Sequence, residues 1–414
     1  MSWLDDILKA TREFESPQKF FYWSALAALS AITKRNVYLR KKSGSSTAYT
    51  LYPNIYVFLV AKSGLRKGVP IKMARKLVKE VDNTRLIVGR SSIQGIIKEI
   101  ATTYTTESGK IRDDAAFFLC ASEFRSSLIG DPDALVTLTD LYDGDFTEGW
   151  RYLLKNAEGT SGELKDIYAV LLGGSNPTHL KEKISKSDID GGFIGRSYII
   201  FADKKGKLNP LTDDIYDEED PLALETETEA LDYKELAKHL IEISKIKGRF
   251  RFHREAKDYY DEWYTKLNNG EFEDRTGTLD RLHDHVLKVA MLLSLTKNQT
   301  LILSREDIED AVEACNELAG NVNRAILPSG TSAFSAQTAT ILQELLNTPG
   351  HELSRRRILQ KFWGDLDAFD LDRIKETLIQ KDAVDIRRCG KDEFLKLKKW
   401  VVEKYLNFAK ETED

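Results

Sequence analysis

The sequence of 414 residues contains little cysteine, proline or methionine. Its three cysteines, Cys120, Cys315 and Cys389, are widely spaced, which excludes a disulfide framework and the paired spacing of a zinc site. This usage fits a reducing compartment, so we expect a cytoplasmic protein. Cys120 lies in an apolar stretch and is expected to be a small buried hydrophobic residue.

Long hydrophobic runs and an excess of positive charge are also missing. The longest apolar runs are far shorter than a membrane span, and the chain does not begin with a secretory signal pattern, so no membrane contact is expected. The formal net charge of −5 excludes a globally basic nucleic-acid-binding protein. Contact with DNA would therefore need local basic patches, or a ring that concentrates them.

Hydrophobic residues make up 42% of the chain, which is ample for the cores of two or three domains. Short apolar runs alternate with helical patterns between residues 50 and 202. The runs at 55–60, 115–121, 166–174 and 197–201 are predicted to be buried strands. This alternation predicts a mainly parallel sheet with helices on both faces. An alanine-rich helical region and a hairpin precede the sheet.

The segment after the first of these strands has the layout of a phosphate-binding loop. Residues 61–68 are small and basic, and apolar residues then recur at helical spacing. Backbone N–H groups and the positive end of the helix would hold phosphates, and Lys67 would reach the outer ones. The candidate nucleotide-binding residues are Ser63, Gly64, Leu65, Arg66, Lys67, Gly68 and Val69.

This loop departs from the usual GxxxxGK[ST] pattern in three places. Ala61 and Arg66 replace the two glycines, and Gly68 replaces the hydroxyl residue that contacts magnesium. Val69 does not supply the missing hydroxyl either. A basic turn between strand and helix that binds no ligand is the alternative interpretation.

Three further polar residues are candidates for the same chemistry. Glu123 follows the strand at 115–121, where an ATPase places a metal-water or general-base carboxylate; capping of the next helix is the alternative. Asn176 follows the strand at 166–174 and would sense a γ-phosphate, or it forms only a turn. Glycines precede Arg196, which indicates a loop that presents this arginine, or an arginine paired with a surface carboxylate.

The remainder of the chain is predicted to be helical up to a last, mixed region. An acidic stretch with little apolar content is expected to be a linker. His283 and His285 are two residues apart, make a poor metal pair and are interpreted as ordinary helix residues. The predicted segments are 1–50 (helical region and hairpin), 51–205 (nucleotide-binding core), 206–232 (acidic linker), 233–330 (helical domain) and 331–414 (winged helix).

The winged-helix prediction rests on three helices and a β-hairpin after residue 333, with Ser354 and Asp370 as expected N-caps. Several basic residues there are candidates for contact with DNA phosphates: Arg355, Arg356, Arg387 and Arg388. Many winged helices bind only protein, and acidic residues dilute this patch, so both interpretations stay open. Lys181, Lys183 and Lys186 form a second basic group in the core.

Taken together and in order, these motifs resemble a known family. The chain has LYPNIYVFLVAKSG at 51–64, an Arg-Lys-Gly version of the phosphate loop, a strand ending in glutamate, LYDGDF, a GGSNP turn and a GGFIGR loop. Over about residues 15–325 it is similar to the RecA-like ATPases and primase-helicase-type proteins of phages, plasmids and mobile islands. The resemblance implies an α/β RecA-like P-loop core with N-terminal helices, followed by a helical domain and a winged helix.

The resemblance also implies roles for the candidate residues. Lys67 would hold the β- and γ-phosphates of ATP, Asn176 would report the γ-phosphate, and Glu123 would activate the attacking water and meet Mg²⁺. Arg196 would act as a finger in the active site of a neighbouring subunit, which requires a homo-oligomer, expected to be a hexamer. Lys181, Lys183 and Lys186 would grip single-stranded DNA in the channel.

The expected function is that of an ATP-dependent, ring-forming DNA helicase or translocase, or of a replication initiator of a phage or mobile element. Its expected partners are single-stranded DNA and a primase or other replication protein. The alternative is a hydrolysis-poor P-loop scaffold or loader, which the altered loop favours. A DNA-packaging motor is less favoured because no nuclease-like carboxylate cluster follows the core.

Overall fold

The computed structural model divides into two compact units, residues 1–326 and 327–414, and each is described by itself. The structure describes residues 2–43, 46–89, 91–106, 109–124, 132–144, 150–151, 163–183, 192–208, 232–269, 277–297, 300–325, 335–363, 366–390 and 392–402.

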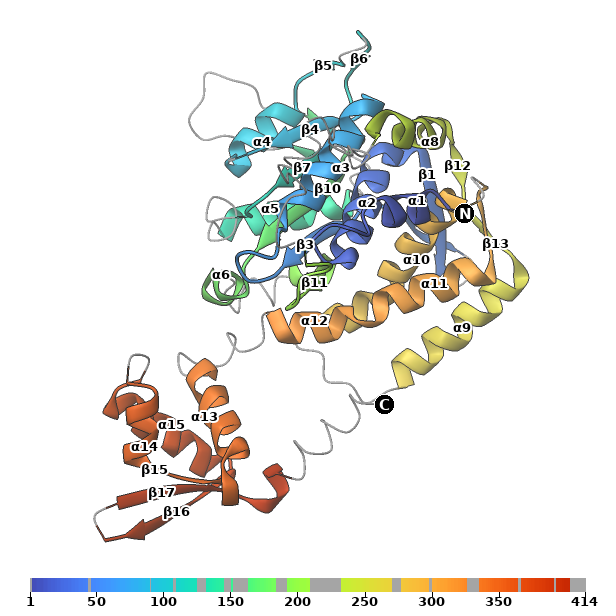
Figure 1. Ribbon diagram of the computed structural model, residues 1–414. Helices are drawn as coiled ribbons and strands as arrows, with labels where there is room; N and C mark the ends of the chain where they lie inside the picture. The colour runs from blue at the N-terminus through green and yellow to red at the C-terminus, as the bar shows by residue number, and fades with distance from the viewer. Residues whose placement is uncertain are drawn as a thin grey trace, which may run out of the picture. The chain divides into compact units, whose positions relative to one another are not determined.

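The centre of the first unit is a five-stranded sheet in which every pairing is parallel. Its order is β11-β3-β10-β7-β4, so the strand that comes first along the chain lies between the fifth and the fourth (Figure 1). The predicted parallel sheet flanked by helices is confirmed. The strands are β3 (Tyr56–Val60), β4 (Arg85–Val88), β7 (Ala116–Ala121), β10 (Tyr168–Ser175) and β11 (Ser197–Phe201).

Side chains alternate between the two faces of the sheet, as the pleat requires. Val57 and Leu59 face a cluster built with α2 (Gln18–Thr33) and α3 (Gly68–Val81), and Cys120 belongs to that face. Burial raises the pKa of the Cys120 thiol to about 12, in line with the predicted apolar role. Tyr56 and Phe58 face the opposite cluster, which contains α4 (Ile93–Ile100) and α5 (Pro132–Asp143).

The helices after residue 232 extend the same core. Buried side chains of α10 and α11 belong to the cluster that holds α2, α3 and one face of the sheet, and Val322 and Ala325 of α12 join the other cluster. The two segments predicted as a core and a helical domain thus share their hydrophobic interior. These helices are α8 (Tyr233–Lys245), α9 (Arg254–Asn269), α10 (Thr278–Lys297), α11 (Arg305–Asn316) and α12 (Leu318–Ala325); α1 (Trp3–Ala10) packs with them.

None of the helices in the described ranges is long and apolar enough to cross a membrane. The longest, α10, has 20 residues. It begins Thr278-Leu279-Asp280-Arg281, and charged side chains continue along its first half.

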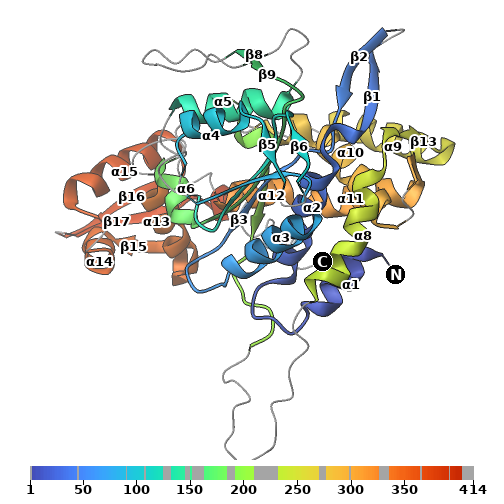
Figure 2. The same cartoon turned by 90° about the horizontal axis from the view of Figure 1, so that it is seen from above.

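The predicted hairpin is present as β1 (Val37–Ser43) and β2 (Ser46–Leu51). It lies beside α10 (Figure 2), to which Lys41 is joined by a 2.9 Å ion pair with Asp284. Two-residue strands were not predicted, because they are too short to show a period. They are β5 (Tyr104–Thr105), β6 (Ile111–Arg112), β8 (Trp150–Arg151), β9 (Glu163–Leu164), β12 (Gly248–Arg249), β13 (Arg251–Phe252) and β14 (Ile302–Leu303).

Among its described residues, the second unit has the helices α13, α14 and α15, a further helical stretch at 399–402, and a three-stranded antiparallel sheet of order β15-β17-β16. Ser354 caps α14 as predicted. The cap predicted at Asp370 is wrong: Asp367 accepts a 2.8 Å hydrogen bond from the Asp370 N–H, and the helix begins three residues earlier than expected. The elements are α13 (Ser335–Asn347), β15 (Glu352–Ser354), α14 (Arg355–Lys361), α15 (Ala368–Gln380), β16 (Val384–Cys389) and β17 (Asp392–Leu397).

Candidate functional site

The loop between β3 and α3 has an unusual backbone. Gly64 and Arg66 have φ angles of 92° and 54°, in the left-handed region, whereas Lys67 is right-handed. Alternating left- and right-handed residues turn successive N–H groups toward one point, which is the geometry of an anion-binding nest. Arg66 stands where the usual pattern has glycine, and its left-handed conformation costs about 1–2 kcal/mol. Arg66 therefore adopts a backbone conformation that glycine reaches at lower cost.

Neighbouring segments hold this strained loop in place. Ser16 Oγ donates a 2.9 Å hydrogen bond to the carbonyl oxygen of Arg66. The Arg66 guanidinium pairs with Glu15 at 3.0 Å, and Glu15 also pairs with Lys205 at 2.9 Å. Hydrogen bonds from Lys205 and Arg66 lower the pKa of Glu15. The loop is therefore tied to the segment before α2 and to the segment after β11.

Lys67 is half-buried, and its ammonium group folds back over the loop. Nζ donates hydrogen bonds of 2.7 Å to the Ala61 carbonyl and 3.1 Å to the Lys62 carbonyl. Burial lowers the pKa of Lys67, and the negative charge of Glu123 opposes that shift. The two side chains are thus close enough to interact electrostatically. A bound phosphate would replace neutral carbonyl partners by a charged one, which makes a stronger hydrogen bond.

Glu123 and Asn176 lie at the same edge of the sheet as the loop. They follow β7 and β10, and β10 lies between β7 and β3, so three adjacent strands end at this edge. Glu123 is exposed to solvent. Asn176 Oδ1 accepts a 3.0 Å hydrogen bond from the Thr178 N–H, which is the turn geometry of the alternative interpretation. The side-chain NH₂ group of Asn176 is therefore the part that would donate a hydrogen bond to a phosphate.

The connections after these strands are bound to one another. The Ala61 N–H donates to the Ser175 carbonyl at 3.2 Å, and the Phe124 N–H donates to the Gly174 carbonyl at 2.7 Å. A Cβ atom at Gly174 would collide with the Ser122 carbonyl, so this close approach requires glycine. The GGSNP turn therefore has a packing role, and it holds the segment after β7 and the start of the β3–α3 loop against the end of β10.

Arg196 lies at the opposite, amino edge of the sheet. It precedes β11, whose Ser197 is in register with Tyr56 at the start of β3. Its side chain is 11% exposed, pairs with Asp143 with an Nε–Oδ1 distance of 2.9 Å, and donates to the Gly192 carbonyl at 3.1 Å. The structure does not bring Arg196 to Lys67 within one subunit. The carboxylate pairing that the sequence left open is present.

The residues at the loop would hold a metal ion only together with the phosphates of a bound nucleotide. Gly68 has no hydroxyl, and no group of three metal-ligating side chains occurs in the described part of the chain. Mg²⁺ is commonly held by substrate phosphates, water and one or two carboxylates. Glu123 is the carboxylate at this edge that would complete such a set.

Comparison with known proteins adds no assignment: no family model matches this chain, and the curated proteins contain no match to it. A role for this site therefore rests on the residues and their geometry. A loop with left-handed turns, a lysine, a carboxylate and an amide at one edge of a parallel sheet is an arrangement suited to binding phosphates.

The basic candidates for DNA contact are only partly described. Lys181 and Lys183 lie on α6 (Pro177–Lys183), but their side chains are not among those described, and Lys186 lies outside the described residues. In the second unit, Arg355 pairs with Asp372 at 2.9 Å, Arg387 with Glu352 at 3.1 Å and Arg388 with Glu393 at 3.9 Å.

Arg356 is exposed on α14. The Arg387 and Arg388 side chains are 65% and 83% exposed despite their ion pairs. Exposed ion pairs contribute only about 0–1 kcal/mol, so a DNA phosphate can compete for these arginines. These arginines are therefore accessible to DNA phosphates, although the paired carboxylates reduce the positive electrostatic potential around them.

A second group of residues was missed in the sequence. Arg281, His285 and Lys288 occur at i, i+4 and i+7, so they share one face of α10. The spacing of His283 and His285 does not reveal this face, because residues two apart on a helix point in different directions. The lysine within an otherwise apolar stretch was the signal, because buried lysines are rare.

Proposed function

We propose that this protein is an ATP-dependent, ring-forming DNA helicase or translocase, or a replication initiator of a phage or mobile element, built on a RecA-like core. One observation carries the proposal. The phosphate loop, Asn176 and Glu123 follow three adjacent parallel strands at one edge of the sheet, where the negative charge of Glu123 acts on Lys67.

In this proposal the backbone N–H groups of residues 63–68 and Lys67 hold the triphosphate. Glu123 orients a water molecule against the γ-phosphate and accepts its proton. Asn176 hydrogen-bonds the γ-phosphate and so distinguishes ATP from ADP. Mg²⁺, carried in by the nucleotide, would neutralise phosphate charge beside Glu123.

The test is ATP hydrolysis measured with and without single-stranded DNA. A helicase or translocase is expected to hydrolyse ATP faster when DNA is bound. The alternative function, a hydrolysis-poor scaffold or loader, is favoured by the absence of a hydroxyl at Gly68. It predicts nucleotide binding with negligible turnover under both conditions.

A ring would use Arg196 in the site of the adjacent subunit. Because Arg196 is held by Asp143 in its own subunit, ring assembly would have to open that pair. Arg196→Ala is expected to abolish hydrolysis while leaving ATP affinity nearly unchanged, since arginine fingers supply about 10³–10⁵-fold of the rate.

The measurement is a mixing experiment. Arg196→Ala and Glu123→Gln protomers, each inactive alone, should regain activity at the interfaces that combine an intact arginine with an intact glutamate. If every mixing ratio stays inactive, the arginine does not act between subunits. Measuring the oligomeric state of each variant controls for failed assembly.

The exposed arginines of the second unit, Arg356, Arg387 and Arg388, give a separate prediction. In the full chain, Arg356→Ala, Arg387→Ala and Arg388→Ala together are expected to weaken DNA binding and to reduce the slope of log K against log salt by about 2–3. The slope is measured by titration at several salt concentrations. An unchanged slope would favour a protein partner for this domain. All three arginines are exposed, so the triple variant is expected to fold. Its thermal unfolding is measured to check this.

A further inference from the structure

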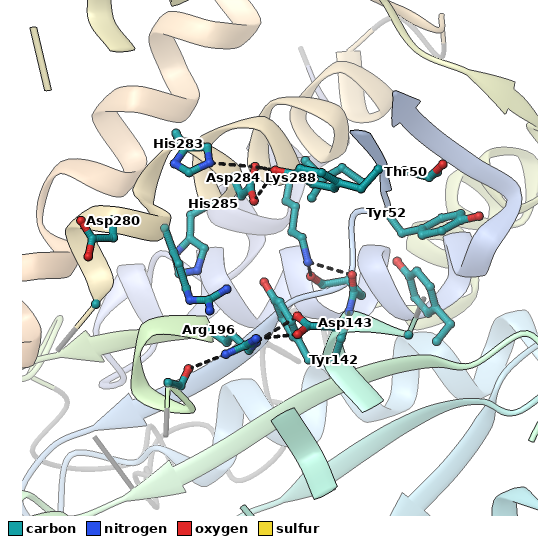
Figure 3. A pocket seen from close by; sticks show the side chains of 18 of the residues that line it. Thr50, Tyr52, Tyr142, Asp143, Arg196, Asp280, His283, Asp284, His285 and Lys288 are labelled. Carbon is teal, nitrogen blue, oxygen red and sulfur yellow. Dashed lines mark hydrogen bonds and ion pairs between the residues drawn. The ribbon is translucent and has the colours of Figure 1, made fainter. Parts of the chain in front are cut away.

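A cavity of about 840 Å³ lies at the amino edge of the sheet, at the other end of the strands from the phosphate loop (Figure 3). Its walls come from β2 and the segment after it, the end of α5, the start of β10, the segment before β11, and the first half of α10. This volume is within the range of small-molecule sites. The polar residues that matter most to its chemistry are Asn54, Asp143, Arg196, Asp284, His285 and Lys288.

Lys288 is 3% exposed and has only neutral hydrogen-bond partners. Nζ donates to Asn54 O at 3.0 Å and to Asn54 Oδ1 at 2.8 Å, and it lies 3.7 Å from the centre of the Tyr142 ring. No ion pair to it occurs among the residues that the structure describes. Burial lowers the pKa of Lys288 to about 7, with Arg196 and Arg281 acting in the same direction and Asp284 and Asp143 opposing it.

His285 lies on the same wall, one helical turn before Lys288. It is 1% exposed, and neither ring nitrogen has a hydrogen-bond partner in the described part of the structure. The ring stacks on Tyr198 at 4.2 Å, which fixes its plane. Burial, with Lys288 next, lowers the pKa of His285 to about 3, so the ring is neutral and offers one donor and one acceptor. Buried polar atoms without partners are rare in proteins.

Two carboxylates on the wall are already engaged. Asp143 pairs with Arg196, and Asp284 pairs with Lys41 and accepts a hydrogen bond from Tyr49 at 2.8 Å. Neither of them pairs with Lys288. A ligand with a negative oxygen would supply the missing counter-charge and a partner for the His285 ring.

We propose that this cavity is a second ligand site that binds a small oxyanion, a phosphate or carboxylate group, against Lys288 and His285. It is separate from the site at Lys67, because the two lie at opposite edges of the sheet. Anion binding would hold Lys288 in its charged form and would therefore take up a proton near neutral pH.

Calorimetric titration tests this in a Lys67→Ala background, which weakens anion binding at the phosphate loop. Inorganic phosphate, sulfate and acetate are titrated in turn. We expect at least one to bind, and Lys288→Met in the same background to weaken it by roughly 10–100-fold, the size of a hydrogen bond to a charged group. Lys288→Met fills the same space with an apolar side chain but leaves the two Asn54 oxygens without their donor, so thermal unfolding is measured to check that the variant is folded. His285→Phe keeps the stacking on Tyr198 and should weaken binding to a lesser degree.

Proton uptake separates a direct contact from a structural effect. With sulfate, which does not titrate near neutral pH, the heat at pH 8 should depend on the ionisation enthalpy of the buffer, and Lys288→Met should remove that dependence. Competition by a ten-nucleotide single strand would identify DNA phosphate as the source of the anion, and lack of competition would identify a free small anion. Equal affinity with and without Lys288, or no binding of any of the three anions, overturns the proposal. Neither result depends on ATP hydrolysis.

Discussion

Replacing Lys67 with alanine is expected to lower the rate of ATP hydrolysis by on the order of 10²–10³-fold, the effect of removing one donor that stabilises developing charge. It is also expected to weaken ATP binding. The ammonium group is held over the loop by the Ala61 and Lys62 carbonyls, so it is already close to where phosphates would bind. Little rearrangement would be needed, and most of its interaction energy would go to the nucleotide.

The measurement is steady-state hydrolysis together with titration of a fluorescent ATP analogue. Lys62→Ala is a matched control, because it removes the same charge from an exposed residue of the same loop. A variant at Lys67 that hydrolyses and binds like the Lys62 variant would show that the loop is only a basic turn.

The sequence was sufficient to place four of the five strands of the sheet; the fifth, Arg85–Val88, is only partly buried and gives no continuous apolar run. Tyr56–Val60 and Ala116–Ala121 are buried along their whole length, and only such strands give continuous apolar runs. A phosphate loop is predicted there from a strand, a small basic segment and a helix, even though Arg66 breaks the glycine pattern. Arg66 has a left-handed φ and is held by contacts with Ser16 and Glu15. Contacts between residues so far apart in the sequence cannot be predicted from a local pattern.

Contacts between distant segments account for what was not predicted. The partner of Arg196 is Asp143, 53 residues earlier, and nothing near either residue indicates the pairing. The strand order is also a long-range property, and it decides that Asn176 falls between the loop and Glu123. The cavity at the amino edge combines the hairpin, three strand or helix ends and α10. Its lysine was visible in the sequence, but the empty space around it was not.

The second large effect is expected for Glu123→Gln. Glutamine keeps the shape of the side chain but cannot accept the proton of the attacking water, so hydrolysis should fall by about 10²–10⁴-fold. ATP affinity should be unchanged or higher, because a negative charge beside the phosphates is removed. The pKa of Lys67 should fall further, since Glu123 is the charge that opposes its lowering by burial.

The decisive comparison is between binding and turnover in the same variant. ATP retained on Glu123→Gln after separation from free nucleotide, with no ADP formed over many wild-type turnovers, is the expected result. Glu80→Gln is the matched control, since it removes the same charge from an exposed position near the far end of α3. If Glu123→Gln hydrolyses ATP at the wild-type rate while Lys67→Ala does not, the loop binds the nucleotide but the base is another group. The charge of Glu123 acts on Lys67. That result would therefore also show that this charge is not needed for hydrolysis.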